Sequence, residues 1–199
     1  MLSSIAAGIE AADIMVKTAD VTPIFFKTVC PGKFMAAVSG DVAAVTASIQ
    51  AGREVRPEAI ADWFIIPNIH RDVIKAVAGC VPLLERGAIG VIETFSVASA
   101  IVAADAAAKA ASVRILDVRT ALGLGGKGFV LLSGDVAAVQ AAVRAGEEHA
   151  RESGLLVGTT VLPRPADSLF ELILESIAKR MMQFLPFAHS RGIWRIETS

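Results

Sequence analysis

Apolar residues recur along the chain with two periods, one near 3.6 residues and one near two, and these periods predict its elements. The longer period predicts helices over residues 4–18, 41–56, 95–111 and 135–152, and an amphipathic helix over residues 169–185. Short runs rich in Val, Ile and Phe predict strands over residues 21–29, 33–39, 60–66, 88–92, 113–122, 129–133 and 155–162. The second half therefore has the order βαββαβ, in which helices pack on one face of an antiparallel sheet.

The chain repeats the same succession of residues once. Ala11-Ala12-Asp13 recurs 92 residues later as Ala103-Ala104-Asp105, and Gly40-Asp41-Val42 recurs 94 residues later as Gly134-Asp135-Val136. A long period that occurs only twice indicates a duplicated domain, because a solenoid needs several short repeats. The predicted fold class is α+β, with tandem ferredoxin-like βαββαβ domains over residues 1–80 and 81–165, then an amphipathic helical connection over residues 166–190.

The first domain lacks an opening strand, and the C-terminus offers one. Ile196-Glu197-Thr198 matches Ile92-Glu93-Thr94 of the second domain's opening strand. We therefore expect residues 191–199 to complete the first domain's sheet, as in a circular permutation, because native sheets avoid unpaired edges. The alternative is a chance likeness in an unrelated tail.

Composition narrows the class of protein. The 199 residues carry 19 basic and 20 acidic side chains, so a nucleic-acid partner is not expected. Mean hydropathy is high at +0.58, yet stretches free of charge, such as Thr94–Ala104, are too short to span a membrane. The start lacks a secretory signal and the two cysteines form no disulfide framework, so a cytoplasmic protein is expected. Apolar surface without a span indicates burial in an oligomer.

Several blocks together resemble one family. They are Thr28–Phe34, Ile66–His70, Ile89–Thr94, Gly123–Lys127 and Val161–Pro165. In these blocks the chain resembles the shell proteins of bacterial microcompartments, specifically the tandem-domain class and most closely the T-type of the propanediol-utilisation shell. The resemblance implies a homotrimer with pseudo-sixfold symmetry that tiles laterally with other shell proteins, around a core that includes encapsulated redox enzymes.

The resemblance also implies a central pore and a cofactor. The residues that would line the pore lie in the loops between the second and third strands of each domain: Val29, Cys30, Pro31, Gly32, Lys33, Gly123, Leu124, Gly125 and Gly126. In the T-type class the cysteine matching Cys30 is the metal ligand of a 4Fe-4S cluster, one cluster per trimer, and soft thiolates suit such a cluster. The alternatives are an unliganded thiol and a plain metabolite pore. Cys80, between the repeats, is expected to be a small buried hydrophobe.

The resemblance further implies tile edges at Lys17, Lys109, Asn68 and Arg164. Alternatively, each lysine is a solvated side chain paired with Asp13 or Asp105, four residues earlier. The three histidines have no metal-ligand spacing, and no catalytic set is recognised, so we expect no enzyme. Two other functions remain open: a ferredoxin-like regulatory module that binds a small ligand, and an iron–sulfur electron carrier unconnected with a shell.

Overall fold

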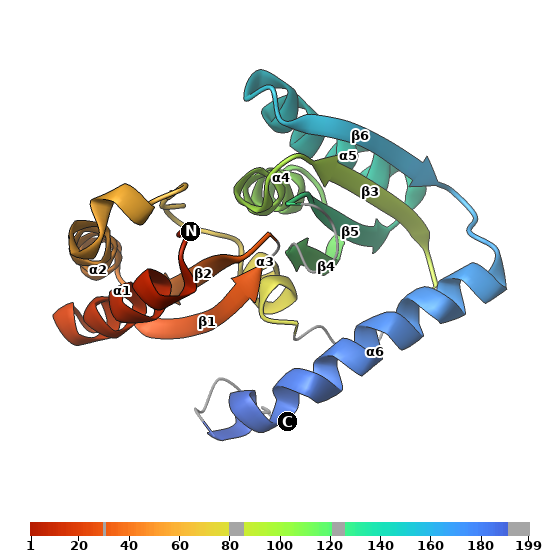
Figure 1. Cartoon of the computed structure of the whole chain (residues 1–199). Coiled ribbons are helices and arrows are strands. Elements are labelled where there is room, and N and C mark those ends of the chain that lie inside the picture. Colours follow the sequence, from red (N-terminus) through yellow and green to blue (C-terminus); the bar gives the residue numbers. More distant parts are fainter. Residues whose placement is uncertain (30, 80–85, 121–125, 191–199) are drawn as a thin grey trace.

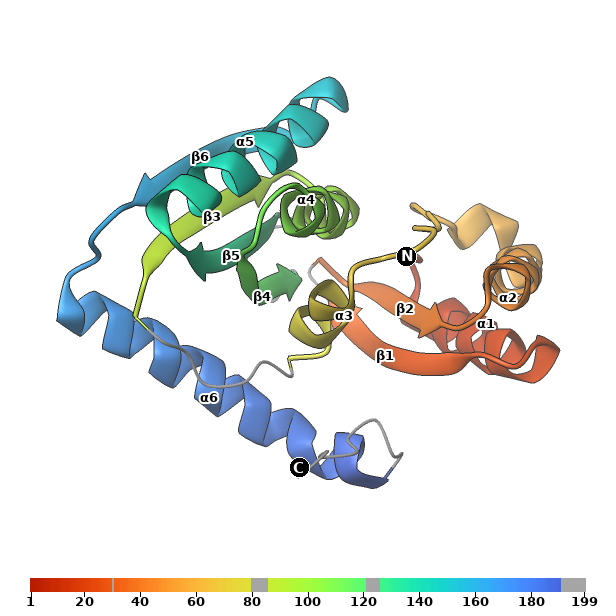
Figure 2. The same cartoon turned by 180° about the vertical axis from the view of Figure 1, so that it is seen from behind.

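The computed structural model describes residues 1–29, 31–79, 86–120 and 126–190. The chain folds into two domains followed by a long helix (Figures 1 and 2). In order, the elements are α1 (Ile5–Thr18), β1 (Thr22–Val29), β2 (Lys33–Ser39), α2 (Val42–Val55), the 3₁₀ turn η1 (Pro57–Ala59), α3 (Arg71–Val77), β3 (Ala88–Thr94), α4 (Val97–Ala110), β4 (Arg114–Thr120), β5 (Gly128–Gly134), α5 (Val136–Glu152), β6 (Leu156–Leu162) and α6 (Asp167–Ser190).

The second domain is a complete split βαβ sandwich. Its four strands form one antiparallel sheet, as the sequence predicted, and their order in the sheet is β4-β5-β3-β6. Helices α4 and α5 cover one face, where Ile92, Val130 and Leu132 are fully buried. The other face packs against α6, through Ile89 and Leu131 of the sheet and Phe170 and Ile177 of the helix. Both faces of this sheet are therefore covered within one chain.

The first domain has the same helices but a smaller sheet. Strands β1 and β2 form a two-stranded hairpin. Helix α1 begins at Ser4, whose hydroxyl accepts a hydrogen bond from the Ala7 N–H, and Ser96 caps α4 in the same way at the equivalent position. Many residues of domain 1 and of the segment after it have an equivalent 92 to 96 residues later, so the two copies can be compared at these positions.

One expectation about domain 1 was wrong, and one helix was not predicted. The predicted strand over residues 60–66 forms only a single bridge, between Ile60 and Leu2. A strand needs a bonded neighbour along its length, and among the described residues the segment bonds only to Met1 and Leu2, through residues 60–62. Helix α3 was not predicted; it packs on β4 and α4 and thereby joins the domains (Figure 2). The amphipathic helix over residues 169–185 is confirmed and extends as α6 over Asp167–Ser190. The expected strand 191–199 lies outside the described residues.

Candidate assembly surfaces and pore loops

Hydrogen bonds to the carboxylate of Asp105 hold the junction between the two domains. The backbone N–H of His70 donates to Asp105 Oδ1 at 2.7 Å, and the Lys109 ammonium donates to the other carboxylate oxygen. The Asp105 side chain is only 9% exposed, so both of its oxygens need such donors. This carboxylate therefore fixes the start of α3 against α4.

Helix α3 covers an apolar patch of domain 2. Val73 and Val77 belong to the same buried cluster as Val97, Ile101 and Val118. These three residues of domain 2 are 3%, 6% and 0% exposed. The tail of domain 1 thus closes the outer surface of α4 and β4.

Among the described residues, no helix covers the equivalent patch of domain 1. Ile5, Ile9 and Phe26 occupy the places of Val97, Ile101 and Val118, 92 residues earlier. They are 41%, 58% and 37% exposed, which is unusual for large apolar side chains at positions that the second repeat buries. Asp13, the equivalent of Asp105, has a side chain that is 54% exposed and pairs with Lys17. This apolar patch of domain 1 is therefore exposed to solvent in the single chain.

The start of α6, which follows domain 2, is equivalent to α3, which follows domain 1. The first turns of α6 follow β6 as α3 follows residues 60–70, so Leu169 and Leu172 stand in the places of Val73 and Ala76, 96 residues later. Val73 and Ala76 are fully buried, whereas Leu169 and Leu172 are exposed. Phe170, on the opposite side of the helix, holds α6 to the sheet of its own domain. An apolar stripe of α6 is therefore left facing outward.

The expected pore loops are partly described. Val29 ends β1, is buried and pairs with Lys33, and Pro31 and Gly32 form the turn between them. Gly32 has a φ of 63°, a conformation that glycine adopts without strain. Cys30 lies outside the described residues, as do Gly123, Leu124 and Gly125, while Gly126 is in a turn. In the described part of the chain, no group of three or more His, Cys, Asp or Glu side chains is placed to hold a metal.

The expected tile-edge residues are all at the surface. Lys17 and Asp13 form an exposed pair at 2.6 Å, and Lys109 pairs with Asp105. The pairing that the sequence left open is thus present at both lysines. Asn68 is exposed with a φ of 53°, and Arg164 is exposed after β6. Their role at an edge stays a prediction.

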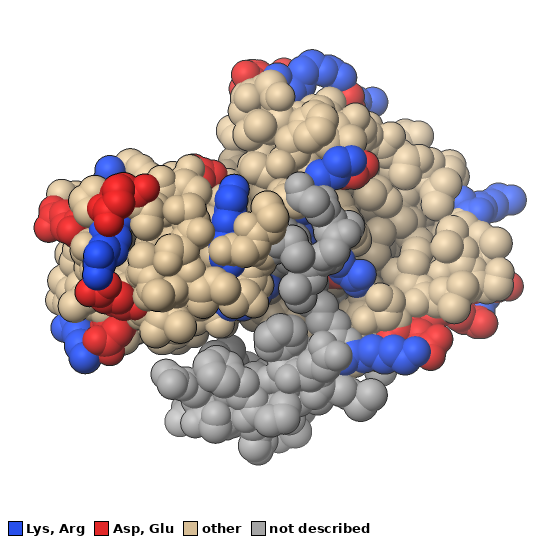
Figure 3. All heavy atoms as spheres, in the orientation of Figure 1, with Lys and Arg blue, Asp and Glu red and all other residues tan. Residues whose placement is uncertain are grey.

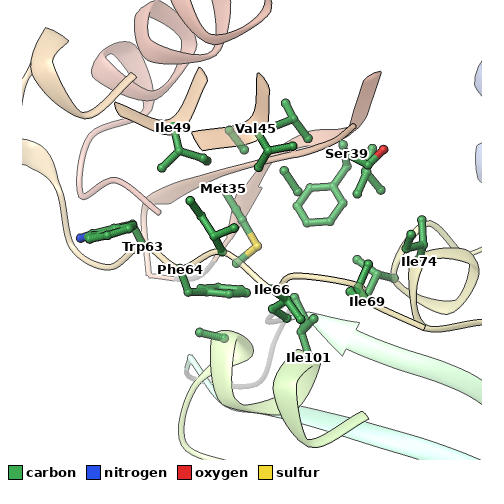
Figure 4. Close-up of a pocket in the computed structure, with 18 of the residues that line it drawn as sticks. Met35, Ser39, Val45, Ile49, Trp63, Phe64, Ile66, Ile69, Ile74 and Ile101 are labelled. Carbon is green, nitrogen blue, oxygen red and sulfur yellow. The ribbon is translucent and has the colours of Figure 1, made fainter. Parts of the chain in front are cut away.

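A cavity of about 490 Å³ opens in domain 1, which the sequence did not reveal. It lies between β2, α2 and residues 62–69, and α3 and α4 close its far side. In Figure 4, Met35, Phe64 and Ile66 point toward one another across it. At its end the Met1 ammonium donates to the Asp62 carbonyl at 2.6 Å. Burial lowers the pKa of this ammonium, and the Asp62 carboxylate opposes that effect.

Charge is intermixed on the visible surface. On the face shown in Figure 3, acidic and basic side chains lie next to one another over domain 1 and α6. Arg86, which precedes β3, pairs with Asp167 of α6 at 2.7 Å, and within α6 Lys179 pairs with Glu175 at 2.7 Å. None of the described helices is both long and apolar enough to cross a membrane.

Comparisons with known sequences agree on one family. The model of the BMC domain matches residues 1–69 and 88–165. The bacterial microcompartment shell protein PduT of Citrobacter freundii is 43% identical over 174 residues, 87% of this chain and 95% of that protein. The carboxysome assembly protein CcmO of Synechococcus elongatus is 29% identical over 185 residues, 86% of this chain and 66% of that protein. These relatives bear the names of shell and assembly proteins, in line with the expectation of a structural protein.

Solved structures give the same result. A microcompartment protein from Desulfitobacterium hafniense DCB matches with a TM-score of 0.84 and 48% identity, over 85% of this chain and 94% of that one. A fused permuted hexameric shell protein from the RMM microcompartment matches with a TM-score of 0.53 and 23% identity, over 76% and 78%. The second likeness concerns the fold alone.

Proposed function

Because the chain belongs to the BMC domain family, as a shell protein of bacterial microcompartments, we propose that three copies of it close into one pseudohexameric tile. The single observation that carries the proposal is the pair of equivalent patches, one covered and one bare. Within a chain the tail of domain 1 covers Val97 and Ile101 of domain 2. The tail of domain 2 then covers Ile5 and Ile9 of the next chain.

This contact is heterologous, because the two surfaces that meet are different. A heterologous contact builds a closed ring when its rotation divides a full turn. If the step from one chain to the next repeats the step from domain 1 to domain 2, six similar domains from three chains close the ring. Each of the large apolar side chains that becomes buried contributes about 1.5–3 kcal/mol, which favours a stable assembly.

The contact also completes a polar pair. His70 and Ala166 are equivalent, and so are Asp105 and Asp13. The Ala166 N–H of one chain therefore donates to Asp13 of the next chain, as His70 does to Asp105 within the chain.

The experiment is the mass of the assembly in solution. Wild-type protein is expected to have the mass of a trimer, and Leu172→Glu is expected to be monomeric because it puts a carboxylate into the contact. Val136→Glu is the matched control, since Val136 is an exposed apolar residue at the start of a different helix, α5. Wild-type protein that remains monomeric, or a trimer that tolerates Leu172→Glu, contradicts the proposal.

For the pore, we propose that the Cys30 thiolates of three chains together hold a 4Fe-4S cluster. The support is chemical: one cysteine per hairpin supplies too few ligands alone, whereas a threefold axis brings three equivalent thiolates together. Pro31 and Gly32 form a tight turn, so the hairpin tip between Val29 and Lys33 is short. A bound cluster supplies one-electron transfer, which suits redox enzymes as the enclosed partners.

The alternative is a tile with a plain metabolite pore, in which the Cys30 thiols stay protonated and unliganded. Both versions share the ring and differ only at the axis. Loss of the cluster therefore leaves the tile proposal intact, and the two are tested separately. Lateral contacts to other shell proteins belong to either version.

A further inference from the structure

Helix α6 continues well beyond the part that is equivalent to α3. Helix α3 has 7 residues and ends at Val77, whereas α6 has 24 residues. The equivalent of Val77, 96 residues later, is Ile173, so the rest of α6 has no helical counterpart among the described residues. Leu169 and Leu172 lie in the first turns of α6. The proposed contact between chains therefore uses only the start of this helix.

The continuation of α6 lies against the outer face of the sheet of domain 2. Leu174 and Ile177 pack on the apolar cluster that includes Ile89, Leu116 and Leu131. Figures 1 and 2 both show α6 on the side of this sheet opposite α4 and α5. Apolar contacts have no preferred direction, so they hold the helix on the sheet without fixing its rotation about its own axis. Fixing that rotation needs a directional contact.

Arg119 of β4 makes a directional contact with the continuation of α6. Its Nη2 donates to Ser176 Oγ at 3.1 Å, and its Nε and Nη2 donate to Asp117 Oδ2 at 3.0 and 2.9 Å. The guanidinium carbon also lies 5.4 Å from the centre of the Phe129 ring. Because a guanidinium is planar and its donors have a fixed arrangement, the carboxylate and the ring together fix where Nη2 points.

The burial of Asp117 keeps Arg119 in this place. The Asp117 side chain is only 3% exposed, and that of Arg119 is 34% exposed. A buried carboxylate that loses its cation pays a large desolvation cost, so Arg119 stays beside Asp117. At the start of α6, by contrast, Arg86 and Asp167 form a pair whose side chains are 63% and 75% exposed. Exposed pairs contribute at most about 1 kcal/mol, so Arg119 is the stronger polar anchor of the helix.

The first repeat has different residues at the places of Asp117 and Arg119. They are Phe25 and Lys27, 92 residues earlier, and the Lys27 ammonium lies 4.3 Å from the centre of the Phe25 ring. The two helices also differ in support, because α3 packs on β4 and α4 of its own chain while the start of α6 is exposed at Leu169 and Leu172. Helices shorter than about 12 residues are marginal without tertiary contacts. The start of α6 therefore needs its anchored continuation.

We propose that Arg119 is a positioning residue, which holds α6 on its own sheet before any neighbour arrives. It does so by bridging Asp117 and Ser176. Because positions 169, 172 and 176 are three and four residues apart, their side chains lie on the same side of the helix. Fixing Ser176 therefore also directs Leu169 and Leu172 toward the next chain, a consequence that rests on the trimer proposed above. A docking helix that is already ordered loses less conformational entropy on association, which strengthens binding.

Hydrogen exchange of α6 in a chain kept monomeric by Ile9→Asp tests this role. The backbone amides of residues 170–177 should exchange slowly, because the helix is anchored without a neighbour. Adding Ser176→Ala should speed their exchange about two- to tenfold, as expected for the loss of one hydrogen bond. Ser168→Ala is the matched control, since Ser168 is an exposed serine in the first turn of the same helix. It should leave the exchange of these amides nearly unchanged.

Arg119→Lys separates positioning from folding. Lysine keeps a cation beside Asp117 but lacks the fork that reaches Asp117 and Ser176 together, so it should speed the exchange of α6 as Ser176→Ala does. With Ile9 restored, both variants should raise the dissociation constant of the trimer by at least the same factor. The urea midpoint of domain 2 should stay unchanged, whereas a merely structural contact would lower it.

Two results overturn the positioning role: rapid exchange of α6 in the monomeric chain, or equal effects of Ser176→Ala and Ser168→Ala. Failure of the trimer proposal looks different. A wild-type chain that is monomeric, yet has a slowly exchanging α6 that Ser176→Ala loosens, would contradict the trimer and support the anchoring of α6 by Arg119.

Discussion

Ile9 and Ile101 occupy the same place in the two repeats, yet Ile101 is 6% exposed under α3 and Ile9 is 58% exposed. This difference separates the folding of a chain from its assembly. Ile101→Asp should lower the free energy of unfolding by several kcal/mol, because it buries a charge without a partner. Ile9→Asp should leave monomer unfolding nearly unchanged and abolish the trimer. Urea titration and mass in solution measure the two effects, and a similar loss of stability in both variants would contradict this division.

Asp105 and Asp13 should differ in the same way, the first stabilising the folded chain and the second the trimer. Asp105→Ala leaves the His70 N–H without its acceptor and should cost about 1–3 kcal/mol of unfolding free energy. Asp13→Ala should spare the chain and weaken the trimer, seen as dissociation at higher protein concentration than for wild type. Lys17→Met is the control, since it removes the partner of Asp13 in the chain and keeps the carboxylate. Equal weakening by both variants would assign the effect to the ion pair.

Two equivalent glycines should respond differently to a methyl group. At Gly146 a Cβ would lie 2.8 Å from the Ala103 carbonyl oxygen, so α4 or α5 has to move. At Gly52 the nearest atom, 2.6 Å away, is Cγ of the flexible Met15 side chain. Gly146→Ala should therefore cost about 1–3 kcal/mol, and Gly52→Ala much less because Met15 adjusts and alanine favours the helix. Thermal unfolding of both variants tests this, and a larger effect at Gly52 would show that Met15 is held rigidly.

Periodicity predicted most of the fold because helices and strands with long apolar patterns form wherever a core can cover them. Helix α4 and strand β3 lie within a few residues of their predicted bounds. Helix α3 was missed because it is only 7 residues long and depends on burying Val73 and Ala76 against domain 2. Residues 60–66 have a strand-like sequence, but a strand exists only beside a bonded neighbour, and among the described residues only Met1 and Leu2 bond to this segment.

The assembly surfaces show the same limit. Lys17, Lys109, Asn68 and Arg164 are at the surface, as the resemblance implied. The sequence shows that Val97 and Ile5 are equivalent, but only coordinates show that one is covered and the other bare. Burial depends on which segment packs above a residue, and that is a property of the fold rather than of a local pattern.

The lysines of the tile edges can be tested without disturbing the ring. Lys17→Glu with Lys109→Glu should leave trimers intact and abolish extended sheets, because like charges then face one another across the edge. At position 17 the new Glu repels the exposed Asp13, which costs only about 0.2–0.5 kcal/mol, whereas at position 109 it also removes a donor to the nearly buried Asp105 carboxylate, which costs about 1–3 kcal/mol of unfolding free energy. Lys75→Glu with Lys179→Glu is the matched control, since both lysines also pair with acids on their own helices. Electron microscopy distinguishes sheets from single tiles, and sheets formed by the first double variant would remove these lysines from the edge.

The last prediction concerns Cys30. Three thiolates that meet on an axis repel one another unless a cation lies between them, so the thiols either stay protonated or bind a metal centre. Protein purified without oxygen should therefore be brown and contain iron and sulfide in the proportion of one 4Fe-4S cluster per trimer. Cys30→Ser should be colourless while remaining trimeric, whereas Cys80→Ser should keep the colour. Wild-type trimers that stay colourless after anaerobic reconstitution with iron and sulfide would leave the plain pore, with the Cys30 thiols unliganded.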